Sequence, residues 1–194
     1  MSAPPDPIEK FRSRFAAARR EEAADPTAAA LATATPDGRP SVRIVLVKEV
    51  DERGFRFYTN LGSRKARELA ANPQAALCFH WPTLAEQVRA EGPVTPLEPE
   101  ESDAYFAARP RAAQLGAWAS RQSEPLSGRA ELLARVAAVT AKHPVGEVPR
   151  PPFWAGFRLL PERMEFWKAG EYRLHDRELY RRADGGWTLE LLYP

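Results

Sequence analysis

The clearest candidate for chemistry in this 194-residue chain is a group of basic side chains that opens a helix. The segment Asn60-Leu61-Gly62-Ser63-Arg64-Lys65 follows a strand-like run and supplies a glycine for a tight turn, a serine for the N-cap and two cations for the first helical turn. Free amide groups at a helix N-terminus favour a bound anion. The pattern indicates a phosphate site, although an ordinary capped helix with solvated cations has the same sequence.

Three more basic groups stand where an anion would be useful. Arg43 and Lys48 flank the apolar run 44–47; being five residues apart, they point to opposite faces of a regular strand and would serve two different anions. Protection of a strand edge explains the same two charges. The second group comprises Tyr105, Arg109 and Arg111, and the third comprises Arg173, His175 and Arg177.

The third group carries a geometric prediction. In an alternating strand from Arg173 to Tyr180, the side chains of Arg173, His175 and Arg177 share one face. That arrangement is costly unless an anion or an acid neutralises it, and a solvated strand face is the alternative interpretation.

Several common catalytic arrangements are missing from the sequence. The three histidines are far apart and have no Cys or acidic companions at metal-ligand spacing, so we expect no metal site. No GxGxxG, GxxxxGK[ST] or GxSxG motif is present. Cys78 lies in an apolar strand pattern that is typical of an inert core thiol.

The elements that must position these residues run in the order strands, helices, strands. Residues 1–24 contain an amphipathic helix that begins at Asp6-Pro7, and 25–96 contain barrel strands, including 41–50, with one short helix from Ser63 to about Asn72. Residues 97–145 are helical, with a longer helix capped by Ser127, and strands return over 153–194. The order favours one α+β domain, an antiparallel barrel with flanking helices, over alternating βαβ units.

Composition limits the class of protein. No segment approaches the roughly 20 apolar residues of a membrane span, and the N-terminus has no apolar run of signal-peptide type. A single cysteine is typical of a reducing compartment, so we expect a cytoplasmic protein that does not enter a membrane. Of 28 basic residues 23 are arginines, but they are spread among 26 acids, and nucleic-acid binding is therefore not expected.

Several long segments in the right order resemble the pyridoxine/pyridoxamine 5′-phosphate oxidase family. They are 43–48, 57–65, Tyr105 through Arg109-Pro110-Arg111, 114–118, 153–158, and 165–167 through 173–177. The resemblance implies an FMN-binding split β-barrel that forms a homodimer with FMN at the subunit interface. It also implies oxidation of pyridoxamine or pyridoxine 5′-phosphate to pyridoxal 5′-phosphate, with O2 as electron acceptor and hydrogen peroxide as product.

Carried over residue by residue, the resemblance implies three sets of site residues. The FMN contacts are Arg43, Ile44, Val45, Leu46, Val47, Lys48, Tyr58, Thr59, Arg64, Lys65, Gln87, Gln122, Ser123, Trp167 and Arg177. The substrate contacts are Lys48, Tyr105, Arg109, Arg173, Leu174 and His175, the first three on the phosphate. Arg173 and His175 are the implied catalytic residues, which orient the substrate ring and stabilise charge; position alone does not make His175 a general base.

Three features depart from the family pattern and keep alternatives open. Ala113 stands where the family has a serine on the substrate phosphate, Leu191 replaces an arginine near the C-terminus, and a basic, tyrosine-bearing segment that closes over the substrate is not found near the N-terminus. The alternatives are a related FMN oxidase of phenazine-pathway type and a flavin-binding or haem-binding split barrel without oxidase turnover.

Overall fold

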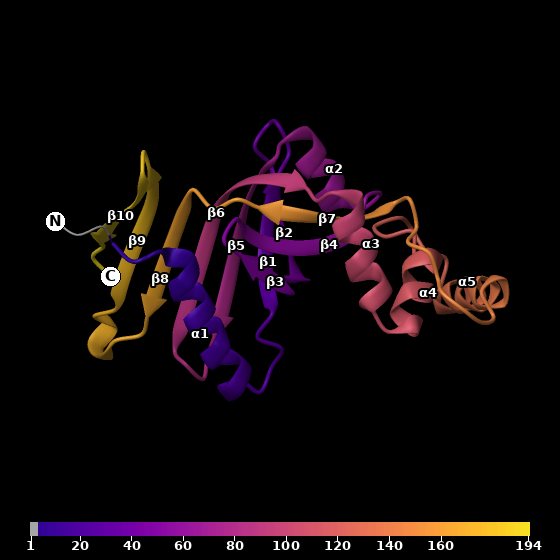
Figure 1. Ribbon diagram of the computed structural model, residues 1–194, viewed down its shortest axis with the longest axis horizontal. Helices are drawn as coiled ribbons and strands as arrows, with labels where there is room; N and C mark the ends of the chain where they lie inside the picture. The colour runs from indigo at the N-terminus through magenta and orange to yellow at the C-terminus, as the bar shows by residue number, and fades with distance from the viewer. Residues whose placement is uncertain (1–3) are drawn as a thin grey trace.

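The computed structural model describes residues 4–194 and has at its centre a ten-stranded antiparallel sheet that curls into a half-barrel (Figure 1). The strands are β1 (Ala28–Ala34), β2 (Pro40–Leu46), β3 (Glu49–Asp51), β4 (Gly54–Asn60), β5 (Gln74–Trp81), β6 (Glu86–Pro96), β7 (Trp154–Leu159), β8 (Arg163–Lys168), β9 (Asp176–Ala183) and β10 (Gly186–Leu191). The helices are α1 (Pro7–Glu21), α2 (Arg64–Ala71), α3 (Pro99–Ala108), α4 (Arg111–Ala119) and α5 (Arg129–Lys142). The predicted α+β antiparallel barrel with flanking helices is confirmed.

The sheet has one continuous path and one branch. Its path runs β10-β9-β8-β6-β5-β1-β2, and the branch consists of β3, β4 and β7, with β7 pairing on the far end of β6. The long strand β6 therefore joins the two parts. Figure 1 shows β8, β9 and β10 at one end of the molecule and α3, α4 and α5 at the other.

Strand β6 changes partner at Gly92. Residues 86–91 pair with β8 and residues 94–96 pair with β7. A Cβ atom on Gly92 would lie 2.1 Å from the carbonyl oxygen of Leu160, because the connection between β7 and β8 crosses directly over this residue. The crossing is fixed by Leu160 N–H, which donates to the Pro93 carbonyl at 2.8 Å. Only glycine leaves room for it.

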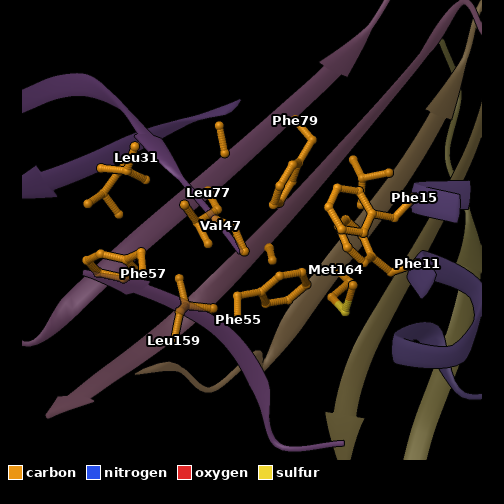
Figure 2. Packing of buried hydrophobic residues seen from close by; sticks show 14 of the residues in the cluster. Phe11, Phe15, Leu31, Val47, Phe55, Phe57, Leu77, Phe79, Leu159 and Met164 are labelled. Atoms are coloured by element: carbon orange, nitrogen blue, oxygen red, sulfur yellow. The ribbon is translucent and has the colours of Figure 1, made fainter. Parts of the chain in front are cut away.

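Helix α1 packs on the sheet with the apolar stripe that its sequence predicts. Asp6 Oδ1 accepts a hydrogen bond from Ile8 N at 2.8 Å, Pro7 occupies the first turn, and the buried side chains include Ile8, Phe11, Phe15 and Ala18. Figure 2 shows Phe11 and Phe15 among the core residues of the sheet. The Phe11 ring centroid lies 4.8 Å from those of both Phe55 and Phe79, so this helix anchors the aromatic core.

A second, smaller cluster lies beneath the helices at the other end. It contains the buried residues Phe106, Leu115, Val148 and Trp154, with Tyr58 and Tyr105 packed against them. This cluster connects α3 and α4 to strands β4 and β7.

Two element predictions are wrong in detail. The predicted strand 41–50 is divided into β2 and β3, because Val47 turns into the core and its N–H bonds to the Thr27 carbonyl at 2.8 Å. Ser127 does not cap α5: Gly128 is the N-cap residue, and the Ser127 hydroxyl instead donates to Glu131 at 2.6 Å. Within residues 4–194, no helix is long and apolar enough to cross a membrane.

The crossing at Gly92 generates a stability prediction. Gly92→Ala pushes a methyl group against a backbone carbonyl, so we expect a loss of about 1–3 kcal/mol in the free energy of unfolding. Gly116→Ala is the control, because a Cβ there meets nothing within 4 Å and alanine suits the interior of α4. Urea unfolding of both variants measures the difference; equal midpoints for the two would contradict the crowded crossing.

Candidate functional site

The predicted helix start with Ser63 as its N-cap is present at α2. Ser63 is fully buried, and its hydroxyl accepts a hydrogen bond from Ala66 N–H at 3.4 Å, as an N-cap serine should. The backbone N–H of Arg64 donates to Ser123 Oγ at 3.2 Å. Ser123 belongs to the segment after α4, so two predicted FMN contacts distant in sequence meet at this helix end.

Lys65 is a buried cation held only by neutral groups. Its Nζ donates to Thr59 Oγ1 at 3.0 Å and to Gln122 Oε1 at 3.1 Å, and it forms no ion pair with any residue in 4–194. Burial, and secondarily the charge of Arg43, lowers the pKa of Lys65 to about 8. An anion placed beside Nζ would favour the charged form and raise this pKa.

The two arginines of this region are bound to one carboxylate. Glu68 accepts hydrogen bonds from Arg64 Nε at 2.8 Å and from Arg43 Nη2 at 3.3 Å, and also from the hydroxyls of Thr33 and Ser41 at 2.5 Å each. Burial raises the pKa of Glu68, but these donors outweigh burial and hold that pKa at about 2. Glu68 is therefore a permanent anion, and it is already fully occupied.

A cavity of about 360 Å³, which we call the α4 cavity, opens between β4, α4 and the end of α3. Its lining includes the predicted site residues Ile44, Val45, Leu46, Tyr58, Thr59, Lys65, Arg109 and Gln122. Ala113 and Trp154 also line it. The cavity is of the size that takes a small ligand, and it brings the predicted FMN and substrate residues together.

Arg109 is the second cation of this cavity without an acid. Its guanidinium carbon lies 4.9 Å from the Trp154 ring centroid and 5.5 Å from that of Phe106. Its Nη1 is buried and has no hydrogen-bond partner, and burial lowers its pKa. A buried charged donor without an acceptor is rare, and here it stands at the wall of a ligand-sized cavity.

Three aromatic rings support this wall. Tyr58 and Tyr105 stack with ring centroids 3.8 Å apart and planes 3° apart, and Trp154 lies 5.3 Å from Tyr58 at 6°. Burial raises the pKa of Tyr58 to about 12 and also raises that of Tyr105, so both phenols stay protonated at neutral pH. They can act as hydrogen-bond donors.

A second group of predicted residues lies on three neighbouring strands. Gln87 of β6, Trp167 of β8 and Arg177 of β9 are direct cross-strand neighbours and form one row. They line a different cavity of about 360 Å³, the β8 cavity, together with His175. Arg177 Nε donates to the buried carboxylate of Glu165 at 2.9 Å, which fixes the position of the guanidinium.

The predicted strand containing Arg173 and His175 is wrong. Strand β9 begins only at Asp176, and residues 171–173 form a 3₁₀ turn in which Tyr172 and Arg173 have φ of 53° and 65°. The chain folds back on itself so tightly that a Cβ on Gly170 would lie 1.9 Å from the Leu174 carbonyl oxygen. Arg173, His175 and Arg177 therefore do not share one strand face.

The turn presents its side chains in different directions. Tyr172, Arg173 and Leu174 are exposed, whereas His175 lies with its ring centroid 4.7 Å from that of Trp167. Gly170 N–H donates to His175 Nδ1 at 3.2 Å, which leaves Nε2 as the protonated nitrogen of the neutral ring. His175 therefore faces the β8 cavity with a donor.

Eight predicted site residues do not line either cavity: Arg43, Val47, Lys48, Arg64, Tyr105, Ser123, Arg173 and Leu174. Lys48 Nζ donates to Thr27 Oγ1 at 2.8 Å and to Asp25 at 3.2 Å, so the structure does not bring it to Tyr105 and Arg109. Val47 is fully buried in the core. Arg111, grouped with Arg109 by sequence, instead binds the carbonyls of His143 and Gly146 and ties α4 to the end of α5. Leu174 is 70% exposed.

Trp154 is the site residue whose role the sequence did not reveal. It is 6% exposed and stands at the first position of β7, opposite Asn60. Its motif is visible in the sequence, but a tryptophan after prolines gives no sign of the arginine it contacts. The contact between Trp154 and Arg109 forms only once α3 is folded over β7.

Comparisons with known proteins agree along the whole chain. The family model for pyridoxamine 5′-phosphate oxidase matches residues 15–143, and that for the pyridoxine 5′-phosphate oxidase C-terminal dimerisation region matches residues 154–194. A pyridoxine/pyridoxamine 5′-phosphate oxidase of Anaeromyxobacter dehalogenans is 60% identical, covering 100% of this chain and 98% of its own length. One from Myxococcus xanthus is 56% identical, with 98% and 93% covered.

Solved structures show the same fold. PhzG from Burkholderia lata, in complex with tetrahydrophenazine-1-carboxylic acid, has a TM-score of 0.92 and 37% identity, covering 100% of this chain and 95% of that one. An FMN-binding protein from Nostoc punctiforme has a TM-score of 0.77 at 22% identity, with both chains fully covered. With full-length relatives at this identity, the chain belongs to the pyridoxine/pyridoxamine 5′-phosphate oxidase family of enzymes.

Proposed function

We propose that this protein binds FMN and oxidises pyridoxamine or pyridoxine 5′-phosphate to pyridoxal 5′-phosphate. The observation that carries the proposal is the α4 cavity, where the buried Lys65 and the half-buried Arg109, whose Nη1 is buried, have no carboxylate beside them. Two uncompensated cations in one cavity suit a cofactor phosphate and a substrate phosphate. The relatives at 52–60% identity carry the name of this oxidase.

The residues around α2 fit the phosphate of FMN. Lys65 Nζ has only neutral partners, and the start of α2 adds its helix dipole. Thr59 and Gln122, which bond to Lys65, and Ser123 would complete the donor set. Arg43 and Arg64 act one step further out, because Glu68 holds both.

The substrate phosphate would bind at Arg109 and Tyr105. Arg109 supplies an unused buried N–H group, and Tyr105 stays protonated and supplies a hydroxyl. Lys48 lies outside the cavity in the single chain, so its contact with the phosphate stays a prediction. Ala113 lines the cavity beside Arg109 and offers no hydrogen bond.

Two copies of the chain would complete each site. The α4 cavity is lined in part by α4, whereas Trp167 and Arg177 belong to β8 and β9, and these elements lie at opposite ends of the molecule (Figure 1). Strand β2 is a sheet edge and exposes Val42, Ile44 and Leu46 at 68%, 65% and 44%, next to the α4 cavity. An apolar edge of this kind is suited to a partner, and the match to a dimerisation region supports a homodimer.

The reaction removes a hydride, which carries two electrons, from the substrate carbon that bears the amine or hydroxyl, and a proton from the nitrogen or oxygen on that carbon. When bound, FMN supplies the acceptor for these electrons and passes them to O2, which becomes hydrogen peroxide. The amine substrate then takes up water and releases ammonia, whereas the alcohol gives the aldehyde directly. Arg173 and His175 would orient the pyridine ring from the partner subunit, since a guanidinium stacks on a ring and His175 Nε2 offers a donor.

A phenazine-type substrate is the second candidate, and Ala113 favours it. With alanine in place of serine at position 113, the cavity has one hydrogen-bond donor fewer for a phosphate. PhzG shares the fold at 37% identity. Arg109 nonetheless keeps its free N–H group, so we rank the phosphorylated vitamer first.

Phosphate recognition decides between the two candidates. We expect kcat/KM for pyridoxamine 5′-phosphate to exceed that for pyridoxamine by orders of magnitude, because the phosphate also fixes the ring for electron transfer. Ala113→Ser should lower KM for the phosphorylated substrate by up to about tenfold, or roughly 1.4 kcal/mol, and leave pyridoxamine unaffected. Steady-state peroxide release measures both. Similar kcat/KM values for the two substrates in the unmodified protein would refute the proposed function.

The shared site predicts recovery of activity by subunit mixing. Arg109→Ala and Arg173→Ala should each inactivate the homodimer, because each removes one half of every site. After equal amounts of the two are unfolded together and refolded, about half of the dimers are heterodimers, and each heterodimer has one intact site out of two. Activity should therefore return to about one quarter of the wild-type value. Mixing Arg109→Ala with Arg109→Ala protein is the control. No recovery with folded dimers would place both residues in a site within one chain.

Lys65 predicts that FMN binding takes up a proton at alkaline pH. With a pKa of about 8 in the free protein, Lys65 is neutral above pH 8, and the cofactor phosphate favours its charged form. FMN affinity should therefore fall as the pH rises above about 8, with uptake of up to one proton for each FMN bound. Titration calorimetry in buffers of different ionisation enthalpy measures this uptake. It should vanish in Lys65→Met and persist in the exposed control Lys142→Met.

A further inference from the structure

We infer that Trp154 is a positioning residue for the substrate phosphate: its ring holds the Arg109 guanidinium in place without using any of its hydrogen-bond donors. This inference rests on the proposed function, since it assigns the phosphate to Arg109. It adds a residue to the site that has no role among the predicted contacts.

The geometry around Arg109 separates this support from an ordinary ion pair. The guanidinium carbon lies 4.9 Å from the Trp154 ring centroid, and Arg109 makes no salt bridge with any residue in 4–194. Nearby arginines behave differently: Arg158 and Arg150 are both paired with carboxylates. A carboxylate would neutralise Arg109 and compete with phosphate, whereas a π face stabilises the cation and leaves its N–H groups free.

The Trp154 ring is itself held on several sides. Phe106 contacts it edge-on, with centroids 5.1 Å apart at 70°, and Tyr58 lies parallel to it at 5.3 Å. The backbone is fixed as well, because Trp154 N–H donates to the Pro151 carbonyl at 3.0 Å and Arg150 donates to the Trp154 carbonyl at 2.6 Å. The platform is therefore rigid before any ligand arrives.

Rigidity matters because Arg109 is the C-cap residue of α3, where the helix offers little restraint. Gln114 secures the turn by donating to the carbonyls of Phe106 and Ala107 at 2.9 and 3.1 Å. The side chain beyond it is located by Trp154 and Phe106. A fixed fork of donors loses less entropy when it binds a phosphate than a mobile one does.

The test compares two probes that differ only in the phosphate and cannot be oxidised at the reacting carbon: 4-deoxypyridoxine 5′-phosphate and 4-deoxypyridoxine. Calorimetry on FMN-loaded protein gives the ratio of their affinities. In Trp154→Met we expect this ratio to fall about tenfold, through the phosphorylated probe alone, since methionine fills space without a π face. In turnover, KM for pyridoxamine 5′-phosphate should rise by a similar factor, with kcat changed less than about twofold.

The matched control is Trp187→Met on β10. Arg182 lies over the Trp187 ring at 4.7 Å, so the same cation–π contact is removed away from the α4 cavity, and the affinity ratio should not change. Trp154→Phe retains a weaker π face and should lower the ratio by about threefold. This variant decides the question alone if Trp154→Met does not fold.

The outcomes separate the inference from the proposed function. An unchanged ratio in Trp154→Phe or Trp154→Met, or an equal loss for both probes, would overturn the role of Trp154. A wild-type protein that prefers the phosphorylated probe but does not oxidise pyridoxamine 5′-phosphate would refute the oxidase function, while a ratio that falls in the variants would still support Trp154.

Discussion

Two cations of the α4 cavity, the buried Lys65 and the half-buried Arg109, have no acid beside them, and the surrounding structure is arranged to make this possible. Removing a charge from water without an opposite charge costs free energy, so neutral groups must stabilise these cations. Hydroxyl and amide oxygens serve Lys65, and an aromatic face serves Arg109. Within residues 4–194, Glu68 of α2 forms no salt bridge with Lys65, and its carboxylate is already bonded to four donors. The cavity consequently remains positive.

The sheet places these groups through its branch. Strand β4 carries Tyr58 and Thr59, and it pairs with β7, whose first residue is Trp154. Strand β7 in turn pairs with β6 only beyond Gly92, where the loop that follows β7 crosses over β6. A backbone requirement outside the cavity therefore determines where its aromatic wall stands. Gly156 leaves room for the Tyr58 ring in the same way, because a Cβ at this position would lie 2.7 Å from the ring.

Sequence patterns predicted most elements and the capped start of α2, because these depend on local signals. The stripe of α1, the N-cap at Ser63 and the antiparallel order all follow from spacing and turn residues. Alternation failed after Gly170, where close backbone packing replaces a strand with a turn that has two left-handed residues. Proximity along the chain also misplaced Arg111, which faces α5. The contact between Trp154 and Arg109 links residues 45 positions apart, and no local signal encodes it.

The turn at 171–173 completes the physical picture. Left-handed backbone at Tyr172 and Arg173 costs free energy, and a single chain shows little return, since the side chains from Tyr172 to Leu174 are exposed. Backbone strain of this kind is retained where the conformation serves a functional site. The turn connects β8 to β9 at the strand ends next to Trp167 and Arg177. An uncompensated guanidinium on an exposed, sharply folded turn is suited to reach into a second subunit. There it would meet a cavity that is itself short of negative charge, and a phosphorylated ligand between them would neutralise both sides at once.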